Sequence, residues 1–497
     1  MKKKLGAILM AGVMSISVMA GLAFSTACTS KQKPDFVMPD GGFDTSKDVT
    51  ITFYHTMNQN IRKILQSNIA EFNKLYPNIH VVEEQIGGYD DVLDQITNEI
   101  VAGNQPDLAY CYADHVASYN RSLSVQSLND FLPGGEYVDA KVTQIKLDEK
   151  GNQMVNEDGS YVTEQVSLGL SSTQKEMFIP GYYNEGYMFG DGDKMYTMPF
   201  AKSTEVLYYN KSFFEENDLT PPKTWDEMEE ICKTIRAKGG NQFPFTYDSE
   251  ANWFITMCEQ YGSPYTSATG NKYLFDNTKN REFVQKLADW YQDGYFTTQT
   301  LNGGYTSNLF KNQQSYMCIG SSAGASNQMP SMVATEEGQT YPFEVGITSI
   351  PQVDPSNPKV ISQGPSVCIF KQDDPQRVLA SWLLVKYLTT SVDFQAQFSI
   401  AQGYVPVLKE EVMYTNQTYK TLLDAADPSA PMTAEIVTSI AAKVCMEQEN
   451  AYYTSPAFNG SSDARREVGS LMTAVFEKQK TVDEAFKYAI SKCQFVG

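Results

Sequence analysis

The sequence VTITFYHTMNQNIRKILQSNIAEFNKLYPNIHVVEEQIGGYDDVLDQITNEIVAGNQPDLAYCY, residues 49–112, decides the fold. Runs of β-branched and aromatic residues predict three strands, at 49–54, 79–82 and 108–112. Apolar residues recur with helical spacing from 61 to 75, and a second helix is predicted at 90–102. Strands that alternate with helices predict an α/β lobe with a largely parallel sheet.

The segment 133–190 interrupts this alternation. Residues 142–147 and 161–166 flank two polar, glycine-ended turn sequences, and this pattern predicts a decorated hairpin. Further along, Thr224 is expected to cap a helix, with Glu227 as its capping-box partner. The alternation then resumes, with helices predicted around 280–293, 375–390 and at the C-terminus, and strands at 206–209, 316–320, 344–350 and 366–370.

The N-terminus has the order of a bacterial secretion signal. Three lysines at positions 2–4 precede a mostly apolar run to Phe24, and a small-residue step, Ser25-Thr26-Ala27, ends at Cys28. A cysteine at that place predicts cleavage and lipidation, so 1–27 is expected to be the signal peptide. Plain secretion is the alternative. Residues 28–48 are polar, contain Gly and Pro and show no periodic pattern, which predicts a lipid-anchored tether.

Charge and cysteine usage exclude several functions. The formal charge is −20, and removing the three lysines of residues 1–27, which contain no acid, leaves about −23. Such a chain is not expected to bind nucleic acid or anionic lipid. The seven cysteines after Cys28 are single and scattered, so they predict small core residues and neither zinc nor redox pairs. The 30 tyrosines are compatible with a sugar-like ligand or simply with a tyrosine-rich core and surface.

The sequence shows none of the motifs that mark common enzymes. It lacks the nucleophile elbow, the phosphate-binding P-loop, the zinc-protease helix motif and the dinucleotide-binding glycines. Of the three histidines, His55 and His115 each follow a predicted strand end, where open α/β sheets bind ligands. We therefore expect a non-enzymatic protein without metal or cofactor.

Eight short segments in order carry a resemblance to a known family. They are Phe53-Tyr54-His55, Phe72-Asn73-Lys74-Leu75-Tyr76-Pro77, Gly87-Gly88-Tyr89-Asp90-Asp91, Gly103-Asn104-Gln105-Pro106-Asp107, Met198-Pro199-Phe200, Val206-Leu207-Tyr208-Tyr209-Asn210-Lys211, Pro221-Pro222-Lys223-Thr224-Trp225 and Gly403-Tyr404-Val405-Pro406. Together they resemble the extracellular solute-binding proteins of ABC importers for sugars, and most of all the glycerol-3-phosphate-binding group. The resemblance spans about 49–493.

The resemblance implies the type II fold of periplasmic binding proteins. In that fold two α/β lobes are joined by strands that cross between them, and the ligand lies in the cleft. The expected division puts 49–200 and 318–372 in lobe 1, with 133–190 as an insertion, and 201–317 and 373–497 in lobe 2.

The resemblance also implies which residues bind the ligand. Arg465 falls where the family's phosphate-binding arginine lies, and Trp253 matches an aromatic wall over the ligand. Polar ligand contacts are carried over to Tyr89, Ser203, Ser321, Gly364 and Tyr404. A guanidinium binds phosphate oxygens with two bonds, and an aromatic face suits a sugar or glycerol.

Two departures from the family leave the ligand open. Where the relative has an acidic residue against glycerol hydroxyls, this chain has Ala113, followed by Asp114, which we take as the ligand-binding candidate. A second cleft tryptophan is absent, and Glu250 stands near its place. Register alone does not separate Arg465 from its neighbour Arg466.

The sequence thus predicts a lipid-anchored substrate-binding component of an ABC importer, monomeric and docking on membrane permease subunits. Its expected ligand is glycerol-3-phosphate, a glycerophosphodiester or a related polyol or sugar. The alternatives are an oligosaccharide receptor without phosphate specificity and, from another class, a secreted carbohydrate-active enzyme or adhesin.

Overall fold

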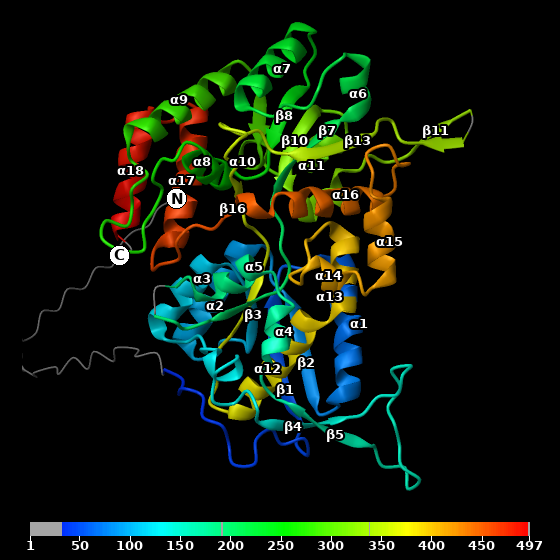
Figure 1. Cartoon of the computed structure of the whole chain (residues 1–497). Helices are drawn as coiled ribbons and strands as arrows, with labels where there is room; N and C mark the ends of the chain where they lie inside the picture. The colour runs from blue at the N-terminus through cyan, green and yellow to red at the C-terminus, as the bar shows by residue number, and fades with distance from the viewer. Residues whose placement is uncertain (1–31, 190–191, 337, 496–497) are drawn as a thin grey trace, which may run out of the picture.

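The computed structural model describes residues 32–189, 192–336 and 338–495, which form two α/β lobes, one above the other in Figure 1. The predicted signal peptide and Cys28 lie outside the described residues. Within the described ranges, no helix has the length and apolar character of a bilayer span.

Lobe 1 is built on a mixed sheet of five strands. Their order is β2 (Ile79–Gln85), β1 (Val49–His55), β3 (Leu108–Cys111), β15 (Ser366–Ile369) and β6 (Thr197–Pro199). β1 is parallel to β2 and β3, but β15 is antiparallel to both β3 and β6, so the sheet is less parallel than predicted. The helices of lobe 1 are α1 (Gln59–Leu75), α2 (Tyr89–Ala102), α3 (Ala113–Tyr119), α4 (Ser172–Glu176), α5 (Pro180–Asn184), α12 (Pro375–Thr390), α13 (Val392–Gln402), α14 (Glu410–Met413) and α15 (Gln417–Ala425).

Lobe 2 has a second mixed sheet. Its order is β13 (Val345–Ser349), β7 (Glu205–Asn210), β10 (Ser315–Ser321), β8 (Phe243–Tyr247) and β9 (Phe296–Thr298). The helices of lobe 2 are α6 (Lys211–Glu216), α7 (Trp225–Ala237), α8 (Glu250–Gln260), α9 (Thr278–Gln292), α10 (Gln299–Asn302), α11 (Ser307–Lys311), α16 (Ala434–Glu447), α17 (Ser461–Phe476) and α18 (Val482–Phe495). Short two-stranded pairs are β11 (Val333–Thr335) with β12 (Gly338–Thr340), and β14 (Val360–Ile361) with β16 (Tyr452–Tyr453).

Local sequence rules explain how individual elements form. In α1 the apolar spacing buries Ile61, Leu65 and Phe72 against the lobe 1 sheet. At the start of α7 the Glu227 N–H donates to Thr224 Oγ1 at 3.1 Å, and the Thr224 N–H donates to Glu227 Oε2 at 3.2 Å. The predicted capping box is confirmed.

The predicted lobe boundaries are wrong in two places. Residues 318–361 belong to lobe 2, because β10 pairs with β7 and β8 and β13 pairs with β7. Residues 373–425 belong to lobe 1, because α12, α13 and α15 bury side chains such as Trp382, Phe394 and Leu423 in its core. The chain therefore crosses between the lobes near 200–204, 362–365 and 426–433.

The insertion contains the predicted hairpin. β4 (Lys141–Ile145) and β5 (Thr163–Ser167) pair antiparallel, with Lys141 opposite Ser167. The residues between the two strands, 146–162, form an arm that projects from the edge of lobe 1 (Figure 1). The side chains of Val155 and Tyr161 in this arm are exposed.

The described part of the predicted tether is docked on lobe 1 and is not a free linker. Phe43 is buried with its ring centroid 6.4 Å from that of Tyr76, and the Phe36 ring lies 5.3 Å from Phe131. Lys33 pairs with Asp373, and the Asp44 N–H donates to Gln376 at 2.9 Å. We call residues 33–48 the docked segment; its two aromatic side chains explain why this polar, unpatterned stretch stays in place.

Candidate functional site

A cavity of about 830 Å³, lined mostly by residues of polar and charged types, lies between the two lobes. Lobe 1 lines it with residues that follow β3, including Tyr112, Asp114 and His115. Lobe 2 lines it with residues that follow β8, from Asp248 to Asn252. Both lobes thus present the carboxyl ends of strands to the cavity, which is where α/β sheets bind ligands.

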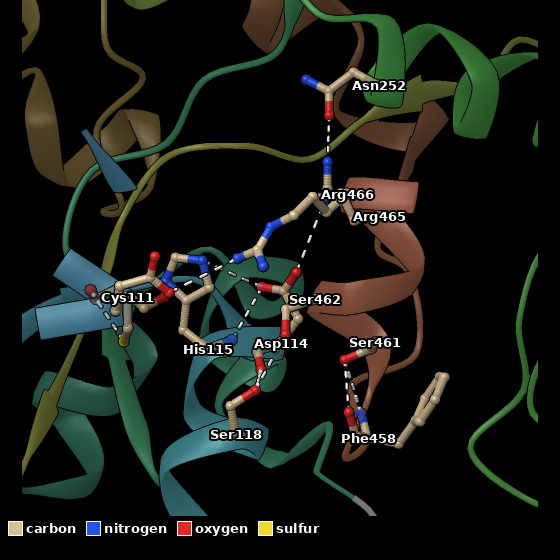
Figure 2. A network of polar contacts seen from close by, with 12 residues as sticks. Cys111, Asp114, His115, Ser118, Asn252, Phe458, Ser461, Ser462, Arg465 and Arg466 are labelled. Atoms are coloured by element: carbon tan, nitrogen blue, oxygen red, sulfur yellow. Dashed lines mark hydrogen bonds and ion pairs between the residues drawn. The ribbon is translucent and has the colours of Figure 1, made fainter. Parts of the chain in front are cut away.

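Arg465 lies in this cavity and connects the lobes. Its Nη1 donates to Asn252 Oδ1 of α8, and its Nε lies 3.5 Å from Asp114 Oδ2 of α3 (Figure 2). Nearby, the hydroxyls of Ser118 and Ser462 are 3.1 Å apart and add a second contact between α3 and α17. Of the two neighbouring arginines, Arg465 is therefore the one held at the centre of the site.

Arg466 lies at the rim of the same cavity. Its side chain is 46% exposed, against 32% for Arg465, and its Nη2 is 3.9 Å from Asp94 of α2. The structure therefore separates the two arginines that sequence register left undecided.

Two carboxylates form part of the lobe 2 wall. Asp248 Oδ1 accepts the Thr306 N–H at 3.0 Å and the Thr306 hydroxyl at 2.6 Å, while burial raises the pKa of Asp248. Glu250 Oε1 accepts the Thr300 N–H at 3.1 Å and the Thr298 hydroxyl. In the described chain no donor contacts Glu250 Oε2, so this oxygen remains an acceptor for a solute hydroxyl.

Hydrogen bonds and an ion pair to Glu185, at the segments that cross between the lobes, form the floor of the cavity. Glu185 of the short helix Glu185–Tyr187 accepts from the Ser362 hydroxyl at 2.6 Å, from the Thr454 hydroxyl at 3.2 Å and from the buried Lys202 ammonium. Gly364 lies on the same floor with a φ of +93°, and a Cβ there would approach the Ala201 carbonyl oxygen to 2.3 Å. Glycine is required because the crossing segments pass so close together.

Four other predicted ligand contacts lie outside the cavity lining. Ser203 is buried in the crossing, where it exchanges backbone hydrogen bonds of 3.0 and 2.8 Å with Gln363. Ser321 accepts the Ala323 N–H at 3.2 Å and so caps a short helix. Tyr404 packs against Phe398, with ring centroids 5.3 Å apart. Tyr89 stacks at 4.3 Å on Tyr112, which itself lines the cavity, so Tyr89 supports the wall from behind.

Trp253 is a core residue, and its predicted place over the ligand is wrong. Its side chain is 0% exposed in the lobe 2 core. It stacks on Tyr247 at 4.7 Å and meets Phe296 edge-on at 4.9 Å. Glu250, Asn252 and Trp253 lie within one turn of α8. Glu250 and Asn252 face the cavity, while Trp253 points into the core.

The site also contains groups that sequence reasoning did not single out. Asn252, Asp248, Lys202 and Tyr265 line the cavity. The signal that could have found the lobe 2 wall is the junction 247–250, where a strand runs into a helix that Ser249 caps by accepting the Asn252 N–H at 3.2 Å. With 59 acidic residues in the chain, the presence of Asp248 and Glu250 did not by itself mark them as site residues.

A buried carboxyl supports the site from lobe 2. Glu205, at the start of β7, is 1% exposed and accepts a hydrogen bond from the Tyr247 hydroxyl. Burial raises the pKa of Glu205 to about 7, although Tyr247 and Asn252 bond to it. Because Asn252 also holds Arg465, a polar chain runs from β7 to α3 of the other lobe.

Two cavity residues have polar atoms without partners. Within the described chain, neither His115 Nδ1 nor the Tyr265 hydroxyl has a hydrogen-bond partner, although both residues are buried. Burial lowers the pKa of His115, which favours the neutral imidazole. Unsatisfied buried polar groups beside a cavity are typical of a site that a bound solute or water completes.

The chain is similar in sequence to proteins named for binding sn-glycerol-3-phosphate. The sn-glycerol-3-phosphate-binding periplasmic protein UgpB of Brucella melitensis is 28% identical over 275 residues, 51% of this chain and 58% of that protein. The protein of the same name from Shigella dysenteriae is 26% identical over 193 residues, 38% of this chain and 36% of that protein. The aligned part thus spans little more than half of the Brucella protein and about a third of the Shigella protein.

Solved structures share the fold over nearly the whole chain. UgpB from Mycobacterium tuberculosis in complex with glycerophosphocholine superposes with a TM-score of 0.67 at 15% identity, covering 90% of this chain and 98% of that one. The maltose/maltodextrin-binding domain MalE from Bdellovibrio bacteriovorus, bound to maltotriose, gives 0.63 at 17% identity, covering 90% and 99%. The predicted two-lobe fold is confirmed. The family model for bacterial extracellular solute-binding proteins matches residues 68–421, and the chain belongs to this family.

Proposed function

We propose that this protein is the lipid-anchored substrate-binding component of an ABC importer. It captures a small polyhydroxylated solute, such as glycerol-3-phosphate, a glycerophosphodiester or a sugar, between its lobes and delivers it to membrane permease subunits. It works as a monomer and is not an enzyme.

The observation that carries the proposal is the polar cavity between the lobes. Its volume of about 830 Å³ is in the range of small-molecule sites. Its walls belong to different lobes, and Arg465 and the Glu185 network link them. A solute that contacts both walls would favour the closed arrangement of the lobes by hinge motion. The ligands named for the relatives, glycerol-3-phosphate, glycerophosphocholine and maltotriose, support the class of solute.

The ligand contacts follow from the lining. We assign direct contacts to Asp114, Gly364, Arg465 and Glu250. Tyr89 acts through Tyr112, while Ser203, Ser321 and Tyr404 hold the crossing segments and the elements beside them.

The anchor is proposed on Cys28. Five residue steps separate Cys28 from Lys33, the first charged contact of the docked segment. At about 3.6 Å per residue they reach at most about 18 Å. A lipid on Cys28 would therefore hold lobe 1 close to the membrane and leave lobe 2 as the mobile half.

A binding screen tests the proposal. Full-length protein is heated with glycerol-3-phosphate, glycerophosphocholine, maltose and maltotriose, and a ligand that binds only the folded state raises the melting temperature. Mass spectrometry of the recovered ligand is the control for turnover. Stabilisation with unchanged ligand supports a receptor. Stabilisation by none of them, or conversion of any of them, contradicts it.

A further inference from the structure

We infer that the cleft selects a polyhydroxylated solute without net negative charge, because Asp114 acts as an internal counter-ion for Arg465. The inference rests on the proposed function and narrows its ligand class. It departs from the phosphate role that the family resemblance gives to Arg465.

Each cation of the cavity already faces a carboxylate of the protein. Arg465 Nε lies 3.5 Å from Asp114 Oδ2, and the Asp114 side chain is only 12% exposed. Lys202 pairs with Glu185. Arg466, at the rim, has Asp94 at 3.9 Å. A phosphate that approached Arg465 would lie beside the Asp114 carboxylate, which already offsets much of the guanidinium charge.

The helix N-termini at the cavity also carry their own acids. Asp90 is in the first turn of α2, and Glu250 is in the first turn of α8; both line the cavity. A helix N-terminus attracts anions through its free N–H groups and its dipole. Here the carboxylates of Asp90 and Glu250 place negative charge beside these two N-termini, which opposes the approach of an anionic ligand.

The charge of the lining completes the argument. Among the described residues, the cavity lining contains five acidic side chains, Asp90, Asp114, Glu185, Asp248 and Glu250, and three basic ones, Lys202, Arg465 and Arg466. Like charges that meet in a partly desolvated site are strongly unfavourable. Hydroxyl groups, by contrast, donate to carboxylates such as Glu250 Oε2. A neutral sugar or a zwitterion such as glycerophosphocholine fits this lining better than a phosphate monoester.

The test compares matched ligands on three proteins. Calorimetry measures glycerophosphocholine against sn-glycerol-3-phosphate, and maltose against maltose 1-phosphate, on the full-length wild type, Asp114→Asn and Asp90→Asn. Asp114 Oδ1 accepts the His115 N–H at 3.0 Å, and the amide oxygen introduced by Asp114→Asn can accept the same bond, so the fold should survive. Asp90→Asn is the control, since it removes one cavity charge without releasing Arg465. Melting temperatures without ligand show whether each variant is folded.

The expected results are specific. Of glycerophosphocholine and maltose, the wild type should bind one more tightly than the other. That ligand should bind roughly tenfold or more tightly than its matched phosphate monoester, sn-glycerol-3-phosphate or maltose 1-phosphate. Asp114→Asn should strengthen binding of the phosphate ligand by roughly tenfold, and Asp90→Asn by clearly less. Tighter wild-type binding of the phosphate ligand, or equal gains in the two variants, overturns the inference and leaves the receptor function standing. Binding of no ligand by any of the three proteins would overturn both.

Discussion

Replacing Trp253 separates a core residue from a binding residue. The side chain is fully buried and packs on Tyr247 and Phe296, so Trp253→Ala removes an indole from a closed core. Such substitutions cost about 3–5 kcal/mol. For a lobe-sized unit, each kcal/mol lowers the melting temperature by about 2–4 °C. The variant should therefore melt roughly 6–20 °C below the wild type.

The assay is thermal unfolding of full-length protein without ligand, followed by calorimetry on the folded variant. Trp253→Phe should lose clearly less stability, because it keeps an aromatic ring and removes an indole N–H that has no partner in the described chain. Tyr112→Ala is the matched cavity variant: it removes a lining side chain and should weaken binding with a smaller loss of stability. An unchanged melting temperature with weakened binding in Trp253→Ala would refute the core assignment.

Three further predictions concern the anchor, the docked segment and Glu205. Cys28→Ala should release the protein from the membrane fraction, and continued sedimentation with membranes would exclude the lipid anchor. Phe43→Ala should expose the docked segment to protease, whereas Val37→Ala, at a side chain 69% exposed, should not; equal cleavage would show that the segment is not held by its aromatic residues. Burial raises the pKa of Glu205 to about 7, from an ordinary value of 4.5, so the protonated carboxyl stabilises the fold below about pH 4.5 and this contribution is lost as pH rises to 7. This contribution amounts to about 3 kcal/mol. Denaturant unfolding should therefore show that, between pH 5 and 7, the free energy of unfolding falls in the wild type relative to Glu205→Gln. A difference between the two proteins that does not change with pH would contradict the raised pKa.

Sequence patterns predicted the elements but not how they are shared between lobes. The alternation in 49–112 fixes one sheet because neighbouring segments pair there. β10 and β13 pair with β7, more than 100 positions earlier in the chain, and α12, α13 and α15 pack on the distant sheet of lobe 1. No local pattern encodes these long-range contacts, so the boundaries at 318 and 373 were misplaced.

The site was predicted in part for similar reasons. The family resemblance singled out Asp114, Gly364 and Arg465 by motif and register, and all three line the cavity. Trp253 was misplaced because α8 buries apolar residues on most of its surface, so that the sequence does not distinguish its core face from its cavity face. Phe36 and Phe43 lie in a stretch of tether-like composition, and their burial depends on a pocket that lobe 1 forms only after folding.

The most direct test of the account is calorimetric titration of wild type and Glu250→Gln with the solute that stabilises the protein best. The Glu250→Gln variant keeps the oxygen that Thr298 and Thr300 contact but replaces the free carboxylate oxygen by an amide. The account predicts one solute per chain for the wild type. Loss of a charged hydrogen bond, about 1.5–3 kcal/mol, predicts roughly tenfold or more weaker binding in the variant. A stoichiometry other than one, or equal affinity in both proteins, would contradict a solute site in the cleft between the lobes.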